Sequence, residues 1–482
     1  MHHALQAAGA RIDCDVCVIG AGSAGLSAAA GAAQLGARVV LIERGEMGGD
    51  CLNTGCVPSK SLIAAAHAAH AYRTASEFGV GEGLEPIVDF PLVHQHVHGV
   101  IASIAPHDSV ERFESLGVTV LKGSAAFVSP TEVVAGSHRI RARRFALATG
   151  SRAFVPPVDG LRELEPLTNE NIFDLRERPD HLLIVGGGPI GLEMAQAFRR
   201  LGSEVTLVDV GTILPRDEPE AAALVRARLR IEGITLHENA KLVDPKRSET
   251  GIAATIESAM MSEPVVASHI LVAAGRRPNI EGLGLEVAGI ETGPKGVKVD
   301  SRLRTTNRRV FALGDVAGGP QFTHIAGYHG GIFIRNALFG IPAKADYSAL
   351  PWVTYLDPEV AHVGLTEAEA RKTHRNVSII SQSFEEIDRA QAEKRTEGFI
   401  KLVLDGSRVL GVTIVAPHAG EMISLWGLVI SGKVPLSAVA SMIAPYPTLA
   451  EISKRAAGAY YKPKVFGSLP RALVGLVQKV LP

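Results

Sequence analysis

The sequence has few cysteines and no excess of either charge. Only four of its 482 residues are cysteine, which excludes a scaffold held together by many disulfides. Lys and Arg number 49 against 50 Asp and Glu, so we expect no broad positive field for nucleic acid or for a membrane surface. No apolar run approaches the roughly 20 residues that span a bilayer.

The first ten residues also lack the basic start and the apolar stretch of a secretory signal. These absences predict a cytoplasmic protein without nucleic-acid or membrane partners. Apolar residues make up 46% of the chain and charged residues 21%, which is ordinary for a globular enzyme. The length predicts about three domains.

One pattern occurs twice in the chain. It consists of a buried strand, a G-x-G-x-x-G turn, a helix, and a second strand that ends at an acid. The first copy has its turn at residues 20–25 and its acid at Glu43, and the second has them at 186–191 and Asp209. In each copy the acid follows the first glycine by 23 residues. Such turns let backbone N–H groups and a helix N-terminus approach a pyrophosphate, while the acid accepts hydrogen bonds from a ribose.

Two copies predict two bound dinucleotides, which we expect to be FAD and a nicotinamide nucleotide. A carboxylate at Asp209 would repel the 2′-phosphate of NADPH, so the second copy favours NADH. NADPH stays open, because Arg199 or Arg200 could reach a phosphate.

Two cysteines lie in a glycine-rich segment, GGDCLNTGCVPSK, between the first acid and a predicted helix over residues 59–71. Cys51 and Cys56 are close enough in the chain to reach disulfide geometry. A helix N-terminus lowers the pKa of a nearby thiol, and the thiolate is the nucleophile of thiol–disulfide exchange. This arrangement predicts a redox-active pair. The alternative is two buried structural cysteines.

That segment resembles the redox-active signature of the class I pyridine nucleotide–disulfide oxidoreductases, which include glutathione reductase, dihydrolipoyl dehydrogenase and mercuric reductase. Residues 305–315 resemble the second FAD motif of this family, residues 148–150 and 274–276 its two connecting turns, and residues 351–365 the start of its dimerisation domain. The resemblance implies an α/β fold with two Rossmann-like dinucleotide-binding domains, a C-terminal α+β dimerisation domain and a homodimer.

The resemblance also implies domain boundaries. The FAD-binding domain would comprise residues 1–158 and 280–348, with the NAD(P)-binding domain inserted at 159–279 and the dimerisation domain at 349–482.

The family's site residues can be placed on this sequence by its motifs. Cys56 would be the thiolate that lies against the flavin, and Cys51 the interchange thiol that meets the substrate. Lys60 and Glu193 would form an ion pair beside the flavin and nicotinamide rings, where a cation stabilises the negative charge of reduced flavin. The predicted cofactor-binding residues are Gly20, Gly22, Ser23, Gly25, Glu43, Arg44, Gly49, Asp50, Lys60, Thr149, Gly150, Gly186, Gly188, Ile190, Gly191, Asp209, Gly275, Arg276, Gly314 and Asp315. No resident metal is predicted.

Two positions depart from the family pattern. Asp50 stands where the family usually has threonine, and its carboxylate would raise the pKa of Cys51. In the C-terminal His-Pro-x-x-x-Glu motif, Tyr446 replaces the histidine while Glu451 is kept. A phenol, with a reference pKa of about 10, is a poor proton acceptor at neutral pH, which argues against lipoamide or glutathione as substrate.

Mercuric reductases also carry tyrosine at that position, where it helps to handle the metal, so Tyr446 favours this branch. Its alternative role is packing at the subunit interface. Two features resist the assignment, because the chain ends in QKVLP without the cysteine pair usual in that branch and lacks the N-terminal metal-binding domain common there.

We therefore expect an FAD-dependent NAD(P)H oxidoreductase that acts on a disulfide or a thiol-bound metal and resembles mercuric reductase. Dihydrolipoyl dehydrogenase is the first alternative, and a flavin-based redox sensor with little turnover is the second. The small-molecule electron acceptor stays open among metal ions, disulfides and quinones.

Two further features receive structural interpretations. Cys14 and Cys17 have C-x-x-C spacing but lie within the first predicted strand, so we expect them to be buried. Residues 471–482 (RALVGLVQKVLP) mix apolar and basic residues. We expect a helix that packs on its own domain, with an amphipathic helix that touches a membrane as the alternative.

Overall fold

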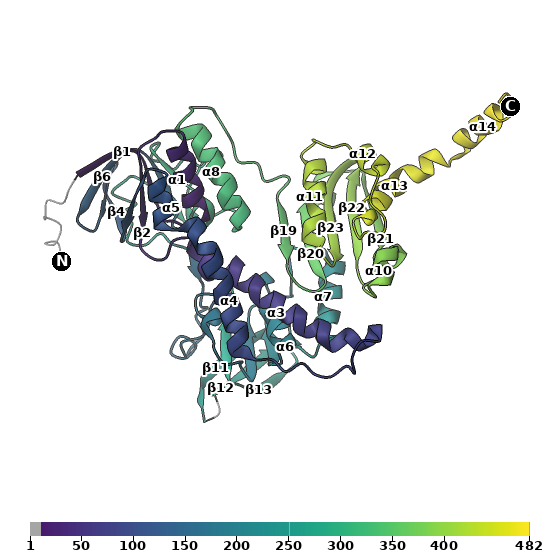
Figure 1. Ribbon diagram of the computed structural model, residues 1–482, viewed down its shortest axis with the longest axis horizontal. Helices are drawn as coiled ribbons and strands as arrows, with labels where there is room; N and C mark the ends of the chain where they lie inside the picture. Colours follow the sequence, from purple (N-terminus) through teal and green to yellow (C-terminus); the bar gives the residue numbers. More distant parts are fainter. Residues whose placement is uncertain (1–10, 250, 482) are drawn as a thin grey trace. The chain divides into compact units, whose positions relative to one another are not determined.

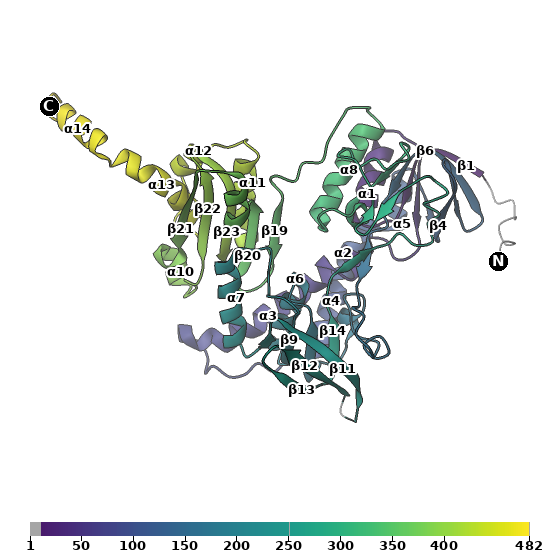
Figure 2. The ribbon, with the colours of Figure 1, turned by 180° about the vertical axis from the view of Figure 1, so that it is seen from behind.

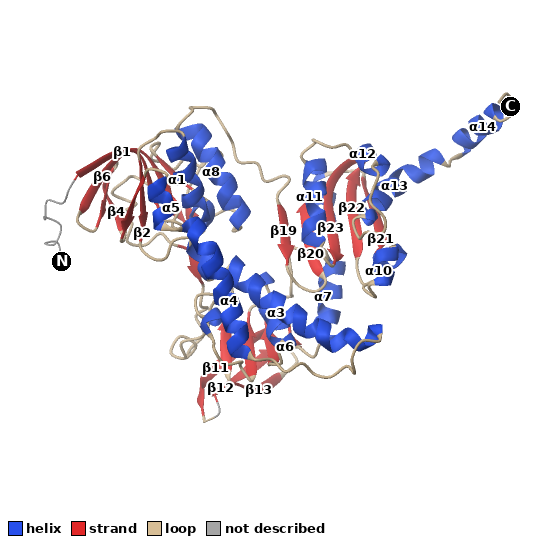
Figure 3. Cartoon of the chain, in the orientation of Figure 1, coloured by secondary structure: helices blue, strands red, loops and turns tan. Residues whose placement is uncertain are grey.

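The computed structural model describes residues 11–249 and 251–481. The chain folds into two compact units. The first comprises the residues through Gly186 together with 197–208 and 240–345, and the second comprises 187–196, 209–239 and the residues from Asp346 onward. Both units contain sheets and helices, and in the second unit the helices gather around one sheet (Figure 3). Over the described residues, no helix has both the length and the apolar character needed to cross a bilayer.

The first unit contains a seven-stranded sheet. Its strands are β1 (Arg11–Ile19), β2 (Val39–Glu43), β3 (Val118–Lys122), β4 (Ala125–Ser129), β5 (Glu132–Ala135), β6 (His138–Leu147) and β18 (Val310–Ala312). They lie in the order β3-β2-β1-β6-β5-β4, and β18 pairs with β6. β1 is parallel to β2 and β6, whereas β5 is antiparallel to β4 and β6. The continuous apolar runs of β1 and β2 are buried, as expected for parallel strands covered on both faces.

Two helices cover this sheet near the first glycine turn. α1 (Ser23–Gln34) follows that turn, and α8 (Thr323–Ala337) lies beside it (Figure 1). A Cβ atom at Gly330 would lie 2.8 Å from the Ser27 Cβ atom, so the close packing of the two helices requires glycine there. This contact brings the start of α8 into the region of the cysteine pair.

The cysteine segment forms two helices. α2 (Gly49–Asn53) carries Cys51, and α3 (Cys56–Thr74) begins at Cys56 and includes the helix predicted over 59–71. α3 packs against α4 (Phe90–Ile104). The remaining short helices of this unit are η1 (Ala75–Phe78), η2 (Ala105–Asp108), α5 (Val110–Ser115), η3 (Ile172–Asp174) and η4 (Gly314–Ala317). Cys14 and Cys17 are both buried in β1, which confirms their predicted environment.

The second glycine pattern also has the predicted elements. β8 (His181–Val185) lies between β9 (Glu204–Val208) and β14 (His269–Val272), and both pairings are parallel. α6 (Pro189–Arg200) follows the glycine turn. A second, antiparallel sheet packs near these parallel strands. It consists of β11 (Ala240–Ser248), β12 (Gly251–Ser258) and β13 (Ser262–Ala267). β7 (Ser151–Ala153) pairs with β15 (Arg276–Pro278), so the two predicted connecting turns lie next to each other. A separate pair is formed by β16 (Thr292–Gly293) and β17 (Gly296–Val297).

The second unit is built on a five-stranded antiparallel sheet. Its order is β19 (Pro351–Thr354), β20 (Glu359–Gly364), β23 (Arg408–Ala416), β22 (Phe399–Asp405) and β21 (Val377–Ser383). Its other elements are α7 (Pro219–Ile231), β10 (Thr235–His237), α9 (Glu367–Thr373), η5 (Phe384–Glu386), α10 (Asp388–Ala392), α11 (Ala419–Ile430), α12 (Leu436–Ser441), α13 (Glu451–Val465) and α14 (Ser468–Val477). The fully buried Trp426 of α11 donates a hydrogen bond to the Ser453 Oγ of α13 at 3.2 Å, which joins two helices in the core.

The prediction that the C-terminal tail packs on its own domain is wrong. No residue of α14 is buried. The reason is that α11, α12 and the first half of α13 already fill the apolar face of the sheet with residues such as Trp426, Leu436 and Ile452. α14 therefore contributes no residue to this core.

Candidate redox-active site

The first glycine turn has the close contacts that its sequence predicts. Gly20 has a φ of +103°, and a Cβ atom there would lie 2.4 Å from the Ala148 carbonyl oxygen. A Cβ atom at Gly25 would lie 1.8 Å from the carbonyl oxygen of Gly20. Both positions therefore exclude any side chain, and the turn presents bare backbone at the start of α1, as a pyrophosphate requires.

The acid at the end of the second strand holds this turn in place. One Glu43 oxygen accepts a hydrogen bond from the Ala21 N–H at 2.5 Å, and the other accepts from the Gly45 N–H at 2.7 Å. Each oxygen keeps a further lone pair, so the carboxylate can still accept from the hydroxyls of a ribose. The residues present fit an FAD at this place.

The second copy repeats this arrangement with different residues. One Asp209 oxygen accepts from the Gly187 N–H at 2.5 Å, and the other accepts from the Gly211 N–H at 2.6 Å. The donors occupy the same motif positions as in the first copy. The two predicted nucleotide sites therefore share one construction, in which the acid braces the glycine turn that precedes it.

The cysteine turn is fixed by local hydrogen bonds. The Asn53 side chain donates to the carbonyl oxygens of Met47 and Gly49 at 3.0 and 2.9 Å. Cys51 is half-buried and Cys56 is exposed, and both are thiols in the structure. The Cys56 sulfur lies 3.1 Å from the hydroxyl oxygen of Thr323, at the first residue of α8. Sequence reasoning missed Thr323, because it is 267 residues away from Cys56 and no local motif marks it.

The two thiols of the turn differ in acidity. A hydrogen bond from Cys51, a second from Thr323 and the positive charge of Lys60 outweigh burial and lower the pKa of Cys56 to about 6. The same hydrogen bond to Cys56, together with burial, raises the pKa of Cys51. The position of Cys56 at the first residue of α3 also favours a thiolate. At neutral pH the reduced pair therefore holds one proton, on Cys51, and Cys56 is the thiolate.

Asp50 takes part in an ion pair. One of its oxygens lies 3.0 Å from the Arg276 guanidinium, and the other accepts hydrogen bonds from the Thr54 hydroxyl and the Asn169 amide, both at 2.8 Å. Its carboxylate raises the pKa of Cys56 slightly, against the larger lowering influences, whereas burial and Cys56 dominate the raised pKa of Cys51. The Asp50 carboxylate thus opposes the Cys56 thiolate. The raised pKa that we expected for Cys51 comes mainly from Cys56 and from burial.

Arg276 connects Asp50 to the second FAD motif. Its guanidinium donates to the Ser151 hydroxyl at 2.7 Å and lies 3.8 Å from the Asp315 carboxylate, which accepts from the same Ser151 hydroxyl at 2.6 Å. Burial raises the pKa of Asp315. These contacts bring three residues predicted from separate motifs into one polar network.

The backbone of the second FAD motif is held by a histidine that sequence reasoning missed. His329 of α8 accepts a hydrogen bond at Nδ1 from the Gly314 N–H at 3.0 Å. Burial lowers the pKa of His329 to about 4, so the ring is neutral and can accept this bond. A neutral acceptor fixes the turn before Asp315 without adding a charge to the site.

Lys60 and Glu193 belong to different units. Lys60 lies in α3 and is half-buried. Glu193 lies in α6, is buried, and accepts a hydrogen bond from the Tyr355 N–H at 2.9 Å. The ion pair between Lys60 and Glu193 stays a prediction, as do the roles of the other site residues.

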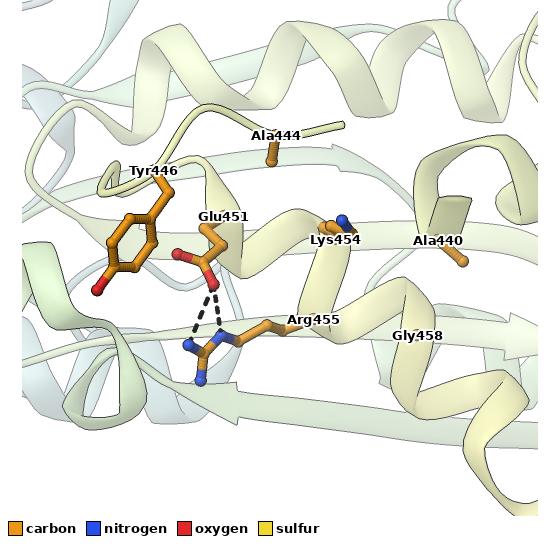
Figure 4. A pocket seen from close by; sticks show the side chains of 7 residues that line it. All are labelled: Ala440, Ala444, Tyr446, Glu451, Lys454, Arg455 and Gly458. Atoms are coloured by element: carbon orange, nitrogen blue, oxygen red, sulfur yellow. Dashed lines mark hydrogen bonds and ion pairs between the residues drawn. The ribbon is translucent and has the colours of Figure 1, made fainter. Parts of the chain in front are cut away.

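The C-terminal motif lines a cleft of about 390 Å³ in the second unit (Figure 4). Tyr446 is 69% exposed, and its hydroxyl donates to an Asp388 oxygen at 2.7 Å. That hydrogen bond raises the pKa of Tyr446. One Glu451 oxygen accepts from Arg455 at 3.1 Å, while Oε2 is buried and has no hydrogen-bond partner among the described residues. Tyr446 is therefore a donor at this cleft and not a proton acceptor.

An acidic cluster in the same unit serves an ion-pair role. Glu218, Glu220 and Glu367 surround the buried Lys401 ammonium at 3.0, 3.0 and 2.8 Å. The Lys401 ammonium therefore lies between the three carboxylates, in the place that a metal ion would need.

Comparison with known proteins identifies the family. Residues 14–330 match the pyridine nucleotide-disulphide oxidoreductase model, and residues 350–457 match the dimerisation domain of the same family. A mercuric reductase of Streptomyces lividans is 38% identical over 451 residues, covering 92% of this chain and 95% of the relative. A dihydrolipoyl dehydrogenase of Thermus scotoductus is 38% identical over 461 residues, covering 93% of this chain and 97% of the relative.

Solved structures agree with these relatives. The Cu(II) complex of the HOCl-induced flavoprotein disulfide reductase RclA from Escherichia coli has a TM-score of 0.82 at 27% identity, covering 93% of this chain and 99% of that one. LpdA from Mycobacterium tuberculosis has a TM-score of 0.84 at 27% identity, covering 92% of this chain and 99% of that one.

The named relatives are enzymes, so a redox sensor with little turnover is not favoured. The two family models together cover most of the chain and include its two glycine patterns, its cysteine pair and its C-terminal sheet. The chain therefore belongs to the pyridine nucleotide–disulfide oxidoreductase family and is an FAD-dependent enzyme that uses NAD(P)H and carries the family's dimerisation domain.

Proposed function

We propose that this enzyme reduces a thiol-bound soft metal ion, with electrons that leave the protein through Cys51 and Cys56. The observation that carries the proposal is the place of Cys56 at the first residue of α3, with its sulfur 3.1 Å from the Thr323 hydroxyl oxygen, an environment that lowers its pKa. Thiolate sulfur is the ligand that soft metal ions prefer. Mercuric reductases among the relatives, and a Cu(II) complex among the solved structures, support a metal as the acceptor.

The sulfur pair does the part of the chemistry that belongs to the chain. An FAD held by the first glycine turn and Glu43, once reduced by the hydride of NADH, would supply two electrons to the sulfurs. The Cys51–Cys56 disulfide then takes up two electrons and one proton and becomes a thiol and a thiolate. Two electrons pass from the reduced pair to the metal ion, the S–S bond forms again, and the proton leaves Cys51. Hg(II) would thereby become Hg(0).

Tyr446 supports a metal over a dithiol or disulfide substrate. Turnover of lipoamide needs a group that takes a proton from a thiol, whereas Tyr446 already donates to Asp388 and has its pKa raised. A metal ion, in contrast, carries no thiol proton that such a group must take. We infer that Tyr446 and Glu451 face Cys51 of the partner subunit in a homodimer, which the matched dimerisation domain supports.

We further infer a preference for NADH. The Asp209 carboxylate is braced by two backbone N–H groups at the end of β9, where it would repel a 2′-phosphate. Arg200, one of the two arginines that could have offset this charge, is buried. Arg199 is still a candidate for a phosphate contact, so the NADH and NADPH rates should be compared directly.

The test is steady-state oxidation of NADH by the FAD-loaded enzyme with different acceptors. Hg(II) with excess thiol should raise the rate well above the rate without acceptor, and lipoamide and glutathione disulfide should raise it little. The matched pair Tyr446→Phe and Tyr446→His separates the phenol from an imidazole at one position. Faster turnover with lipoamide than with Hg(II) by the unmodified enzyme would assign it to dihydrolipoyl dehydrogenase instead.

A further inference from the structure

The last helix exposes its apolar side chains. Leu469 is 81% exposed and Leu473 60%, and Val480 in the turn after α14 is 78% exposed. Within residues 346–481, no other element lies alongside α14, which continues beyond the end of α13 (Figures 1 and 2). A row of exposed leucine and valine side chains on one short helix indicates a surface that binds a protein or a membrane.

The apolar and polar residues of this helix lie on opposite sides. At about 100° per residue, its large apolar side chains fall within an arc of about 160°. They are Leu469, Leu473, Val474, Leu476 and Val477, and Val480 and Leu481 extend the same arc if the following turn continues the helix. The opposite arc holds Arg471, Ala472, Gly475, Gln478 and Lys479. The helix is therefore amphipathic, with cations only on its polar side.

The chain after Glu451, residues 452–482, carries charge of only one sign. Six of the 49 basic residues lie after Glu451, and none of the 50 acidic residues does. The six are Lys454, Arg455, Lys462, Lys464, Arg471 and Lys479, and of these Arg455 is paired with Glu451. An acidic surface is the complementary partner for such a segment.

The match to the family's dimerisation domain does not extend to this helix. The match to the dimerisation domain ends at residue 457, within α13, and α14 begins at Ser468. α14 therefore lies outside the part of the chain that matches the dimerisation domain, so that match gives no support for a second copy of the chain as its partner.

We propose that α14 docks this enzyme on the surface of an anionic lipid bilayer. The apolar arc would enter the boundary between headgroups and acyl chains, and Arg471 and Lys479 would lie at the anionic headgroups. A protein groove accepts a narrow stripe of side chains at i, i+3, i+4 and i+7, whereas an arc of about 160° fits the flat boundary of a bilayer better. Docking of this kind is peripheral, because α14 is too short to span a bilayer. It is independent of the identity of the electron acceptor.

Flotation of the full-length, FAD-loaded enzyme with vesicles tests the proposal. Vesicles of phosphatidylcholine mixed with phosphatidylglycerol should carry the enzyme at about 0.1 M salt, and vesicles of phosphatidylcholine alone should carry much less. Raising the salt to about 0.5 M should release part of the bound enzyme.

Matched variants separate the two sides of the helix. Leu473→Ser with Leu476→Ser should lower the partition coefficient by about tenfold or more, because two buried leucine side chains are lost. Ala472→Ser with Gln478→Ser makes the same number of serine changes on the polar arc and should bind as the unmodified enzyme does. Arg471→Gln with Lys479→Gln should remove most of the preference for phosphatidylglycerol. NADH oxidation in solution should be the same for all four proteins.

Three results would overturn the proposal. The first is that the unmodified enzyme does not float with anionic vesicles, and the second is that the double-serine variant at Leu473 and Leu476 floats equally well. The third is an assembly in analytical ultracentrifugation, without vesicles, that is larger for the unmodified enzyme than for that variant. This last result would assign the apolar arc to a second copy of the chain.

Discussion

Two pairs of cysteines lie within the first 56 residues, and their environments are opposite in chemical effect. Cys14 and Cys17 sit inside β1, where burial raises the pKa of Cys14 to about 12 and that of Cys17 far above its ordinary value. Cys56 begins a helix, beside a thiol, a hydroxyl and a lysine, and its pKa falls to about 6. The spacing of two cysteines therefore indicates less about reactivity than the element that carries them. A strand interior makes a thiol inert, and a helix N-terminus with a nearby cation makes a thiolate.

Replacement of the reactive thiol should have the largest effect. Cys56→Ser should lower acceptor-dependent NADH oxidation by about three orders of magnitude or more, because the pair can no longer form a disulfide. The same change should abolish the long-wavelength absorbance that a thiolate next to flavin gives after two-electron reduction. The matched variant at the inert pair, Cys14→Ser, should keep both. A reduced Cys56→Ser enzyme that retains this absorbance would show that Cys56 is not the thiolate at the flavin.

The acidity of Cys56 can be measured directly in the unmodified enzyme. Because its lowered pKa is about 6, the long-wavelength absorbance of the reduced enzyme should be full at neutral pH and should disappear as the pH falls through about 6 and the thiolate takes up a proton. The titration is followed by absorbance at a fixed degree of reduction. A midpoint near the ordinary thiol value would mean that the hydrogen bonds from Cys51 and Thr323 do not stabilise the thiolate.

A proton acceptor at the C-terminal cleft should change which substrate the reactive pair accepts. Tyr446→His should raise lipoamide turnover by about tenfold, since an imidazole titrates near neutral pH and the phenol does not. Tyr446→Phe is the control, because it removes the hydroxyl without adding a base. Equal lipoamide rates for the two variants would exclude the missing histidine as the reason for poor lipoamide turnover.

The carboxylate beside the pair should have a smaller effect. Asp50→Thr restores the residue that the family usually has and removes a negative charge that opposes the Cys56 thiolate, so the absorbance titration should shift to lower pH. Turnover should change by only a few-fold, because Arg276 balances part of this charge. Asp50→Asn keeps the shape of the side chain but replaces one oxygen with an uncharged NH2 group, and it should shift the titration in the same direction. An unchanged midpoint in both variants would remove Asp50 from the account of thiol acidity.

Much of the fold was predictable because its signals are local. The runs of buried residues in β1, β2 and β8 and the glycine spacing after them define each strand–turn–helix without reference to the rest of the chain. The cysteine pair and the acids Glu43 and Asp209 were predictable for the same reason.

The part of the candidate site that the sequence did not predict depends on long-range packing. Thr323 is 267 residues from Cys56, and Asn169 is 119 residues from Asp50, so no sequence window contains either contact. The neutral state of His329 depends on burial under other elements. The exposed α14 escaped prediction because its apolar periodicity is the same whether the helix packs on its own domain or on an external surface.

Replacement of the inert pair should change stability and leave catalysis intact. Cys17→Ala removes a fully buried sulfur atom from the sheet and should lower the free energy of unfolding by about 1 kcal/mol, since the small void left in β1 cannot be refilled without moving its neighbours. Thermal unfolding of the FAD-loaded enzyme measures this loss, and NADH oxidation with acceptor should stay within about twofold of the unmodified rate, because nothing in the proposed electron path passes through β1. A large loss of turnover at unchanged stability would mean that both cysteine pairs carry electrons, and the contrast between strand and helix terminus would no longer explain which thiols react.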